Sequence, residues 1–377
     1  MSDRICRWGF LSTAEIGFKN WQAVHKSGNG VVAGVASRSR DSAQKFIDRA
    51  QSYFAFDKAP EAHGSYESII ESNSIDAVYI PLPTGLRKTW VIRAAEAGKH
   101  VLCEKPCAVS ADDLAEMIDA CRQNNVQFMD GVMYMHSSRL TKLREVLDDG
   151  KSVGKIKRIA CQFSFNAPDE FHRSNIRTDS RLEPHGCLGD LGWYTIRFAL
   201  WVMRGRMPQK VCARALSVLQ RPDSPAPVPM DFSAELVFDE ETSASFFVSF
   251  QTHHQQWANI SGTRGHLTVN DFVLPYFGNQ LGFAVQNAEF IVDGCDFWME
   301  RHDTQHNVAE YANSHASAQE TNLFRRMSEI VLSGKLDPYY PEISLKTQAV
   351  LDACFESALS NSSIVQPKPF ELLQAQV

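Results

Sequence analysis

Apolar runs and amphipathic segments alternate from residue 5 to residue 133. The apolar runs predict strands at 5–11, 30–37, 75–83, 100–103 and 126–133. Between them, apolar positions three and four apart predict helices at 14–27, 40–50, 65–73, 87–98 and 110–125. Strands that alternate with helices in this way predict a parallel, doubly wound sheet.

The pattern changes after Tyr134. Alternating apolar and polar positions predict strands at 156–165, 210–219, 233–239, 242–250, 257–262 and 265–271, with an exposed loop at 221–229. Helices are predicted at 138–149, 187–203, 316–334 and 344–360. Strands joined by short polar turns are typical of a mostly antiparallel sheet with one solvated face.

Two domains of an α/β fold are expected, because 377 residues exceed what one core usually serves. The first domain is expected at 1–133 and the second at 134–377. The second would carry the open, predominantly antiparallel sheet, and its C-terminal helix could pack back on the first domain.

Composition narrows the class of protein. Hydrophobic residues make up 44% and charged residues 22% of the chain, as in folded globular proteins. The net charge of −6 and the lack of basic clusters argue against a nucleic-acid partner. The N-terminal apolar run is too short for a membrane span or a secretory signal, so we expect a cytoplasmic protein without a membrane partner. None of the nine cysteines forms a C-x-x-C motif, which argues against a disulfide framework or zinc ribbon.

The stretch GFLSTAEIG (9–17) lies where a dinucleotide-binding loop belongs, between the first strand and the first helix. The usual fingerprint there is G-x-G-x-x-G/A, and this chain places Ser12, Ala14 and Gly17 at those three positions. Small side chains and the free helix N-terminus could still hold a pyrophosphate, but an ordinary strand-to-helix turn fits equally well.

The end of the second strand bears on the choice of cofactor. A cofactor with a free ribose 2′-hydroxyl usually meets an acidic residue there, whereas this chain has Ser37, Arg38, Ser39 and Arg40. A hydroxyl followed by guanidinium groups suits a 2′-phosphate, so NADP is favoured over NAD. The alternative is that 37–41 only caps the next helix, with Arg38 and Arg40 in solvent.

Glu104, Lys105 and Pro106 follow the predicted strand 100–103, at the sheet edge where ligands bind in such folds. The proline ends the strand, and an unusual peptide geometry there would aim Lys105. From spacing alone, a surface turn with a salt bridge fits this tripeptide as well.

A second polar group lies on the predicted helix 187–203. Asp190, Tyr194 and Arg197 are spaced so that they share one helix face, which could be either a site or merely solvated. Hydride transfer from an alcohol needs a group that accepts the hydroxyl proton. We expect Tyr194 to do this beside Lys105, because a nearby ammonium lowers the pKa of a phenol.

These residues together resemble the glucose–fructose oxidoreductase, inositol dehydrogenase and rhizopine-catabolism (Gfo/Idh/MocA) family of nicotinamide-dependent sugar and cyclitol oxidoreductases. The resemblance spans almost the whole chain. Its motifs are the N-terminal loop, ASRS (36–39), YIPLPT (79–84), GKHVLCEKP (98–106), GDLGWY (189–194) and PEISLKTQAVLDACFESA (341–358).

The resemblance implies a Rossmann domain and a second α/β domain whose open sheet mediates a homodimer, with the active site between them. Lys105 would contact the reacting hydroxyl and the nicotinamide side, Asp190 would bind substrate, and Tyr194 would be the acid/base. The tyrosine resembles the xylose and dihydrodiol dehydrogenase branches, which mostly use NADP. The residues expected at the cofactor are Ser12, Thr13, Ala14, Ile16, Ser37, Arg38, Pro81, Leu82, Pro83, Thr84, Glu104 and Lys105.

Arg177 and His136 complete the residues expected at the substrate, beside Lys105, Asp190 and Tyr194. Other pocket residues are expected from the loop 166–183, with His172 and Arg173, and from 295–306. Arg87 stands where many family members have a histidine, so its role in the loop after 79–84 is open.

The resulting hypothesis is an NADP-dependent oxidoreductase acting on a sugar, a sugar-derived ketone or a trans-dihydrodiol. Two alternatives stay open: an enzyme with tightly bound NADP(H) that cycles between two sugars, and a non-catalytic NADP sensor. No metal is expected, because His253 and His254 are adjacent in a strand and point to opposite faces.

Overall fold

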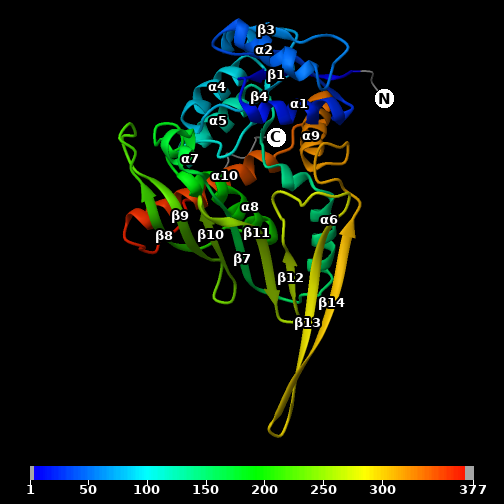
Figure 1. Cartoon of the computed structure of the whole chain (residues 1–377), viewed down its shortest axis with the longest axis vertical. Helices are drawn as coiled ribbons and strands as arrows, with labels where there is room; N and C mark the ends of the chain where they lie inside the picture. Colours follow the sequence, from blue (N-terminus) through cyan, green and yellow to red (C-terminus); the bar gives the residue numbers. More distant parts are fainter. Residues whose placement is uncertain (1–3, 370–377) are drawn as a thin grey trace.

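The computed structural model describes residues 4–369, which fold around two β-sheets (Figure 1). The first sheet has six parallel strands in the order β3-β2-β1-β4-β5-β6, as the doubly wound pattern predicts. Its strands are β1 (Cys6–Leu11), β2 (Gly30–Ala36), β3 (Glu61–His63), β4 (Ala77–Ile80), β5 (His100–Cys103) and β6 (Phe128–Asp130). Sequence analysis missed β3, because three residues are too few to show a period.

Helices connect these strands, as predicted. They are α1 (Glu15–Ser27), α2 (Arg40–Gln51), α3 (Tyr66–Ile70), α4 (Thr84–Glu96) and α5 (Ala111–Gln123). Helix α4 begins three residues before its predicted start, because Pro83 occupies the position just before it and its fixed φ suits a helix entry. After β6 the chain enters a 3₁₀ turn, η1 (Met133–His136), where sequence analysis extended the strand.

The second sheet has eight strands in the order β14-β13-β12-β11-β7-β10-β9-β8. Strands β7 and β10 pair in parallel, and every other neighbouring pair is antiparallel. The strands are β7 (Ile156–Asn166), β8 (Lys210–Leu219), β9 (Val228–Val237), β10 (Ser243–Ser249), β11 (Gln251–Gly262), β12 (His266–Val269), β13 (Leu281–Asp293) and β14 (Asp296–Val308). The predicted open, predominantly antiparallel sheet is therefore confirmed, although β9 and β11 begin earlier than predicted.

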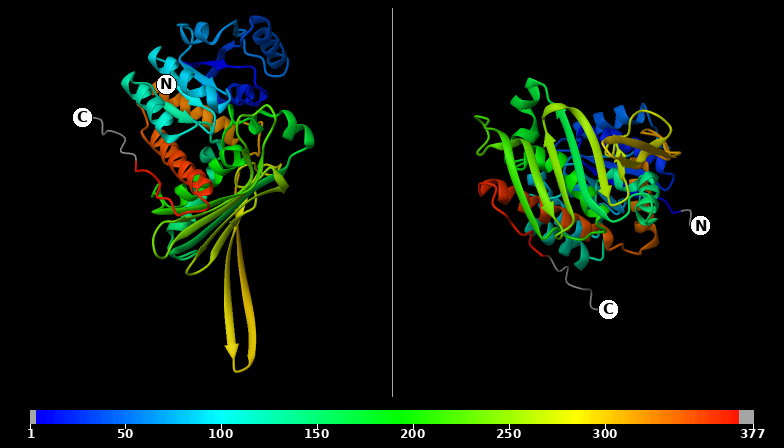
Figure 2. Two further views of the ribbon diagram at one scale, coloured as in Figure 1. Left: turned by 90° about the vertical axis from the view of Figure 1, so that its left-hand side faces the viewer. Right: turned by 90° about the horizontal axis from the view of Figure 1, so that it is seen from below.

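Helices lie on one face of this second sheet, between it and the first domain (Figure 2). They include α6 (Ser138–Asp148), the short α7 (Asp169–Ser174), α8 (Trp193–Val202) and the long α10 (Tyr339–Leu359). The view from below shows no helix of the described chain over the opposite face (Figure 2). None of the helices in residues 4–369 is long and apolar enough to cross a membrane.

Strands β13 and β14 form a hairpin that projects from the body of the molecule (Figures 1 and 2). Neither strand was predicted, and the expectation that 295–306 lines the substrate pocket is wrong, because this segment runs along the projecting hairpin. The hairpin leaves Phe290, Phe297 and Met299 exposed, with the first two rings stacked 5.9 Å apart. Polar and aromatic residues alternate irregularly here, so no period marks the strands.

Helix α9 (Gln319–Ser333) returns from the second domain to the core of the first. Its Phe324 packs edge-on against Trp8 of β1 at 5.0 Å, and Trp8 donates a hydrogen bond to Ser328. Figure 1 shows α9 beside α1. The C-terminal part of the chain thus supplies one of the helices that cover the parallel sheet and fixes the two domains to each other.

Candidate active site

Lys105 follows the carboxyl end of β5, and the bond from Lys105 to Pro106 is a cis peptide, in line with the predicted unusual geometry. The Lys105 Nζ atom donates hydrogen bonds to both the carbonyl oxygen and Oδ1 of Asp190, each at 2.7 Å. Only 9% of the Lys105 side chain and 14% of the Asp190 side chain are exposed. Two motifs 85 residues apart in the sequence therefore meet where the two domains face each other.

Asp190 lies in a turn of π-helix, η3 (Leu188–Gly192), that leads directly into α8. Arg177 donates from Nε to the second oxygen of Asp190 at 2.8 Å, so one carboxylate is shared by two cations. Burial opposes the charged form of Asp190, but Arg177 and Lys105 outweigh it and hold the pKa of this carboxyl below its ordinary range. Asp190 is thus a fixed anion that orients both cations.

Tyr194 lies in the first turn of α8, beside this group. Lys105 Nζ is 4.4 Å from the centre of the Tyr194 ring, over its face, and the phenol hydroxyl contacts the sulfur of Met133 at 3.7 Å. Burial, and after it the Glu104 and Asp190 carboxylates, raise the pKa of Tyr194 well above its ordinary value. The expectation of a lowered pKa is therefore wrong here, because burial and the two carboxylates outweigh the neighbouring cations.

Glu104 belongs to a buried hydrogen-bond network at the base of the site. Its Oε1 accepts a hydrogen bond from the Tyr79 hydroxyl at 2.6 Å, and Asn20 donates to that hydroxyl at 2.6 Å. The second oxygen accepts from the backbone N–H of Lys105 at 3.3 Å. Glu104 therefore holds the backbone that carries Lys105. Sequence analysis quoted Tyr79 only as the first residue of the motif YIPLPT (79–84), and it missed Asn20, which lies inside α1 without a motif.

Arg197 does not lie with the active-site group. It forms a buried ion pair with Asp130 of β6 and donates from Nε to Thr347 of α10 at 2.8 Å. The prediction that Arg197 shares one solvated or functional face with Asp190 and Tyr194 is wrong, because the π-helical turn breaks the helical spacing and α8 is buried on all sides.

The N-terminal loop keeps several features of a pyrophosphate-binding turn. Ser12 adopts a φ of 151°, which glycine reaches most readily, and its hydroxyl accepts a hydrogen bond from the backbone N–H of Ala14 at 3.1 Å. No side chain caps the N-terminus of α1, where Ala14 is the capping residue. Thr13 is half-buried and Ile16 is 43% exposed. The first backbone N–H groups of α1 are thus available to an anion.

The segment after β2 caps the next helix, as one of the two sequence interpretations expects, and contact with a 2′-phosphate stays a prediction. Ser39 caps α2 by accepting a hydrogen bond from the backbone of Ser42, and Ser37 donates its backbone N–H to His63. Arg38 and Arg40 are exposed. Within residues 4–369, no hydrogen bond or ion pair of the Arg38 guanidinium is found, so this cation stands free at the carboxyl edge of the sheet.

The segment 81–84 connects the two domains. Pro81 and Leu82 are buried, and Pro83 precedes α4. Thr84 donates its hydroxyl to Glu183 at 2.6 Å, and the Thr84 backbone N–H donates to the other oxygen of the same carboxylate at 3.1 Å. Sequence analysis missed Glu183, which lies in a loop without a motif.

Arg87 has a structural role. Its buried guanidinium donates to the carbonyl oxygens of Leu82 and Glu104 at 2.7 and 2.9 Å and also to that of Pro106. Arg87 therefore ties the 81–84 segment to the turn that carries Lys105, from beneath the site.

Within residues 4–369, no hydrogen bond or ion pair joins His136 or Arg173 to the group of Lys105 and Asp190. His136 stacks on Tyr340 of α10 with ring centres 5.7 Å apart, and burial lowers its pKa to about 4. Arg173 is exposed and pairs with Glu170. No group of three His, Cys, Asp or Glu side chains in the described part of the chain could hold a metal ion.

Two family models match this chain, one over the part with the first sheet and one over most of the part with the second sheet. Residues 6–132 match the family model described as "Oxidoreductase family, NAD-binding Rossmann fold", and residues 140–268 match the "GFO/IDH/MocA C-terminal domain". The chain belongs to the Gfo/Idh/MocA oxidoreductase family. It is thereby a member of a family of NAD(P)-dependent dehydrogenases and reductases that act on CH–OH groups.

Among curated members of the Gfo/Idh/MocA family, D-xylose 1-dehydrogenase (NADP(+)) 2 of Haloferax volcanii is 29% identical, over 95% of this chain and 98% of its own length. The trans-1,2-dihydrobenzene-1,2-diol dehydrogenase of Homo sapiens is also 29% identical, over 69% of this chain and 72% of its own. Both branches of the family named from the sequence are thus among its relatives.

Solved structures agree in fold. A 3-ketoreductase from Actinomadura kijaniata in complex with NADP and TDP-benzene superposes with a TM-score of 0.76 at 23% identity, covering 94% of this chain and 98% of the other. An aldose–aldose oxidoreductase from Caulobacter crescentus superposes with a TM-score of 0.78 at 19% identity, covering 96% and 100%. At these identities the likeness shows the shared two-domain fold of the Gfo/Idh/MocA family.

Proposed function

We propose that the chain is an NADP-dependent oxidoreductase that transfers a hydride between the nicotinamide and a carbon of a sugar, a sugar-derived ketone or a trans-dihydrodiol. One observation carries this proposal: Lys105 and Arg177 both donate hydrogen bonds to the buried carboxylate of Asp190, directly beside Tyr194. This range of substrates is supported by the names of three relatives. They are a D-xylose 1-dehydrogenase, a trans-1,2-dihydrobenzene-1,2-diol dehydrogenase and a dTDP-3,4-didehydro-2,6-dideoxy-alpha-D-glucose 3-reductase.

The residues at the sheet edge fit a dinucleotide. The positive φ of Ser12 and the uncapped N-terminus of α1 suit a pyrophosphate, and Lys105 lies at the carboxyl end of β5, where the nicotinamide would reach the second domain. When bound, the nicotinamide supplies or accepts the hydride. The protein then has to orient the hydroxyl or carbonyl of the substrate and manage one proton.

Tyr194 would manage the proton, and Lys105 would orient the substrate oxygen. Since its pKa is raised, Tyr194 carries its proton throughout the neutral range and is suited to donate it to a carbonyl oxygen during reduction. The Lys105 ammonium, held by Asp190, would donate a hydrogen bond to the same oxygen and stabilise the charge that develops there. Arg177 would fix the outer side of Asp190 and contact the substrate.

The test is the absorbance of reduced nicotinamide when the purified protein meets NADP⁺ with aldoses and trans-dihydrodiols, or NADPH with sugar-derived ketones. Turnover of at least one class is expected. If NADPH binds tightly but no substrate turns over, hydride transfer to these substrates is wrong, and a sensor is favoured. Turnover only when two sugars are supplied together would instead indicate a tightly bound cofactor that cycles.

Arg38 is expected to select NADP by contacting its 2′-phosphate. Replacing Arg38 with aspartate should weaken NADP⁺ binding by about 10- to 100-fold, since it removes a charge-assisted contact and adds a repulsive charge, while NAD⁺ binding changes by less than about threefold. Dissociation constants from fluorescence titration measure both. Lys45→Asp is the matched control, because Lys45 is an exposed cation further along α2, and this change should leave the affinity for both cofactors unchanged. Equal losses for both cofactors would contradict this role.

We also propose a homodimer formed through the open face of the second sheet. That face carries small or polar side chains such as Ala160, Ser245 and Thr268, and no helix of the described chain covers it (Figure 2). The projecting hairpin adds exposed apolar side chains next to it, an arrangement common at protein interfaces. Sedimentation velocity should give twice the monomer mass, and a monomer at micromolar concentration would contradict the proposal.

A further inference from the structure

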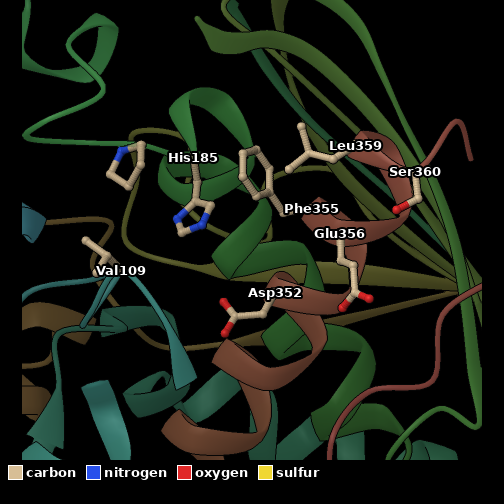
Figure 3. Close-up of a pocket in the computed structure, with 8 residues that line it drawn as sticks. Val109, His185, Asp352, Phe355, Glu356, Leu359 and Ser360 are labelled. Atoms are coloured by element: carbon tan, nitrogen blue, oxygen red, sulfur yellow. The ribbon is translucent and has the colours of Figure 1, made fainter. Parts of the chain in front are cut away.

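A cavity of about 480 Å³ opens on the side of α10 (Figure 3). It is bounded by α10, by the turn at 184–185 and by the segment after Pro106. Its lining residues are Val109, Pro184, His185, Asp352, Phe355, Glu356, Leu359 and Ser360. A cavity of this size suits a small organic ligand.

A wall separates this cavity from the Lys105 site. Gly189, which precedes Asp190, packs against the side chains of His185 and Pro106, so closely that an added Cβ would lie 3.1 and 3.3 Å from them. His185 faces the cavity on the far side of this wall (Figure 3). The cavity is therefore distinct from the proposed active site, and an inference about it does not depend on the proposed reaction.

Two carboxylates line the cavity, and Lys368 acts on one of them, Asp352. Asp352 and Glu356 are four residues apart, one above the other on the same face of α10 (Figure 3). Asp352 accepts hydrogen bonds from the backbone of Ala111 at 2.6 Å and from Gln348 at 2.8 Å. Within residues 4–369, neither carboxylate forms an ion pair, and the nearby Lys368 pairs with Asp112.

His185 provides an independent indication of a ligand. Only 5% of this residue is exposed, and its Nδ1 atom is buried without a hydrogen-bond partner within the described chain. Its ring lies edge-on to Phe355 with centres 4.8 Å apart. Burial lowers the pKa of His185 to about 4, so the imidazole is neutral and keeps one nitrogen as an acceptor. A buried polar group without a partner is costly, which favours a polar ligand in this cavity.

We propose that this cavity binds a small organic ammonium ion with an apolar body. The ammonium would lie against Asp352 and Glu356, where it compensates their charge. The neutral imidazole of His185 offers an acceptor for one of its N–H groups. The rings of Phe355 and Pro184 and the side chain of Leu359 would cover the apolar body. The two carboxylates repel an organic anion, and a neutral molecule would gain no charge-assisted hydrogen bond from them.

The experiment uses the full-length protein with NADPH bound and 2-phenylethylammonium chloride as the probe. 2-Phenylethanol and 3-phenylpropanoate serve as neutral and anionic probes of similar shape. Calorimetric titration at pH 8, where Asp352 is ionised because burial raises its pKa only to about 6, measures the three affinities. The ammonium is expected to bind at least about tenfold more tightly than either matched probe.

Two variants test where the probe binds. The double variant Asp352→Asn with Glu356→Gln is expected to weaken ammonium binding at least about tenfold. Glu96→Gln, a change at an exposed position on α4, should leave it unchanged. Equal affinity for ammonium and alcohol, unchanged binding by the double variant, or no saturation up to about 10 mM would overturn the proposal. Thermal unfolding of each variant verifies that it is folded.

Discussion

Replacing Lys105 with methionine is expected to lower kcat by about 10²- to 10⁴-fold, the usual contribution of a positioned acid, base or charge-stabilising donor. Methionine has a similar length but removes the cation that holds Asp190 and that lies 4.4 Å from the Tyr194 ring. The nicotinamide absorbance assay measures the loss with whichever substrate the wild-type protein turns over. Affinity for NADPH should change far less, since in our proposal the pyrophosphate contacts the N-terminal loop rather than Lys105.

Lys88→Met is the matched control, because Lys88 forms ion pairs with Asp113 and Glu116 on the outside of the first domain. It should leave kcat within about twofold of wild type. Tyr194→Phe should also lower kcat. It should flatten the decline of the reduction rate at high pH as well, because that decline reflects deprotonation of the Tyr194 hydroxyl, which phenylalanine lacks. If Lys105→Met turns over at the wild-type rate while NADPH still binds, Lys105 has no role in the reaction.

Sequence analysis identified the members of the candidate site that follow short motifs and missed those held by tertiary contacts. Lys105, Asp190 and Arg177 were named from the sequence, and they meet at one carboxylate. Glu183 and Asn20 had no signal, since each acts on a partner 59 or more residues away in the sequence. Arg197 was misplaced because a π-helical turn, which no simple pattern reports, breaks the helical spacing after Asp190.

The fold was predictable wherever a period repeats. The parallel sheet follows from five apolar runs between amphipathic helices, and the second sheet from alternating positions. The β13–β14 hairpin has no such alternation, because both faces of β14 are exposed and neither face needs to be apolar. The packing of α9 on the first domain could not be predicted from local sequence either, since the partners Trp8 and Ser328 are 320 residues apart.

Replacing Arg197 with methionine is expected to lower the free energy of unfolding by about 3–5 kcal/mol, because it leaves Asp130 as an unpaired buried charge. The side chains of Arg197 and Asp130 are only 1% and 3% exposed. Arg197 also donates to Thr347, so one guanidinium connects β6, α8 and α10. Urea-induced unfolding followed by tryptophan fluorescence measures the change.

Two further variants distinguish a buried charge from a lost contact. Lys142→Met removes an exposed ion pair with Glu145 and should cost less than about 1 kcal/mol. The double variant Arg197→Met with Asp130→Asn leaves no buried charge and should be more stable than Arg197→Met alone. A single variant within about 1 kcal/mol of wild type would mean that the ion pair contributes little to holding the domains together. A double variant less stable than the single one would mean that the loss comes from packing, since the unpaired carboxylate would then not be its cause.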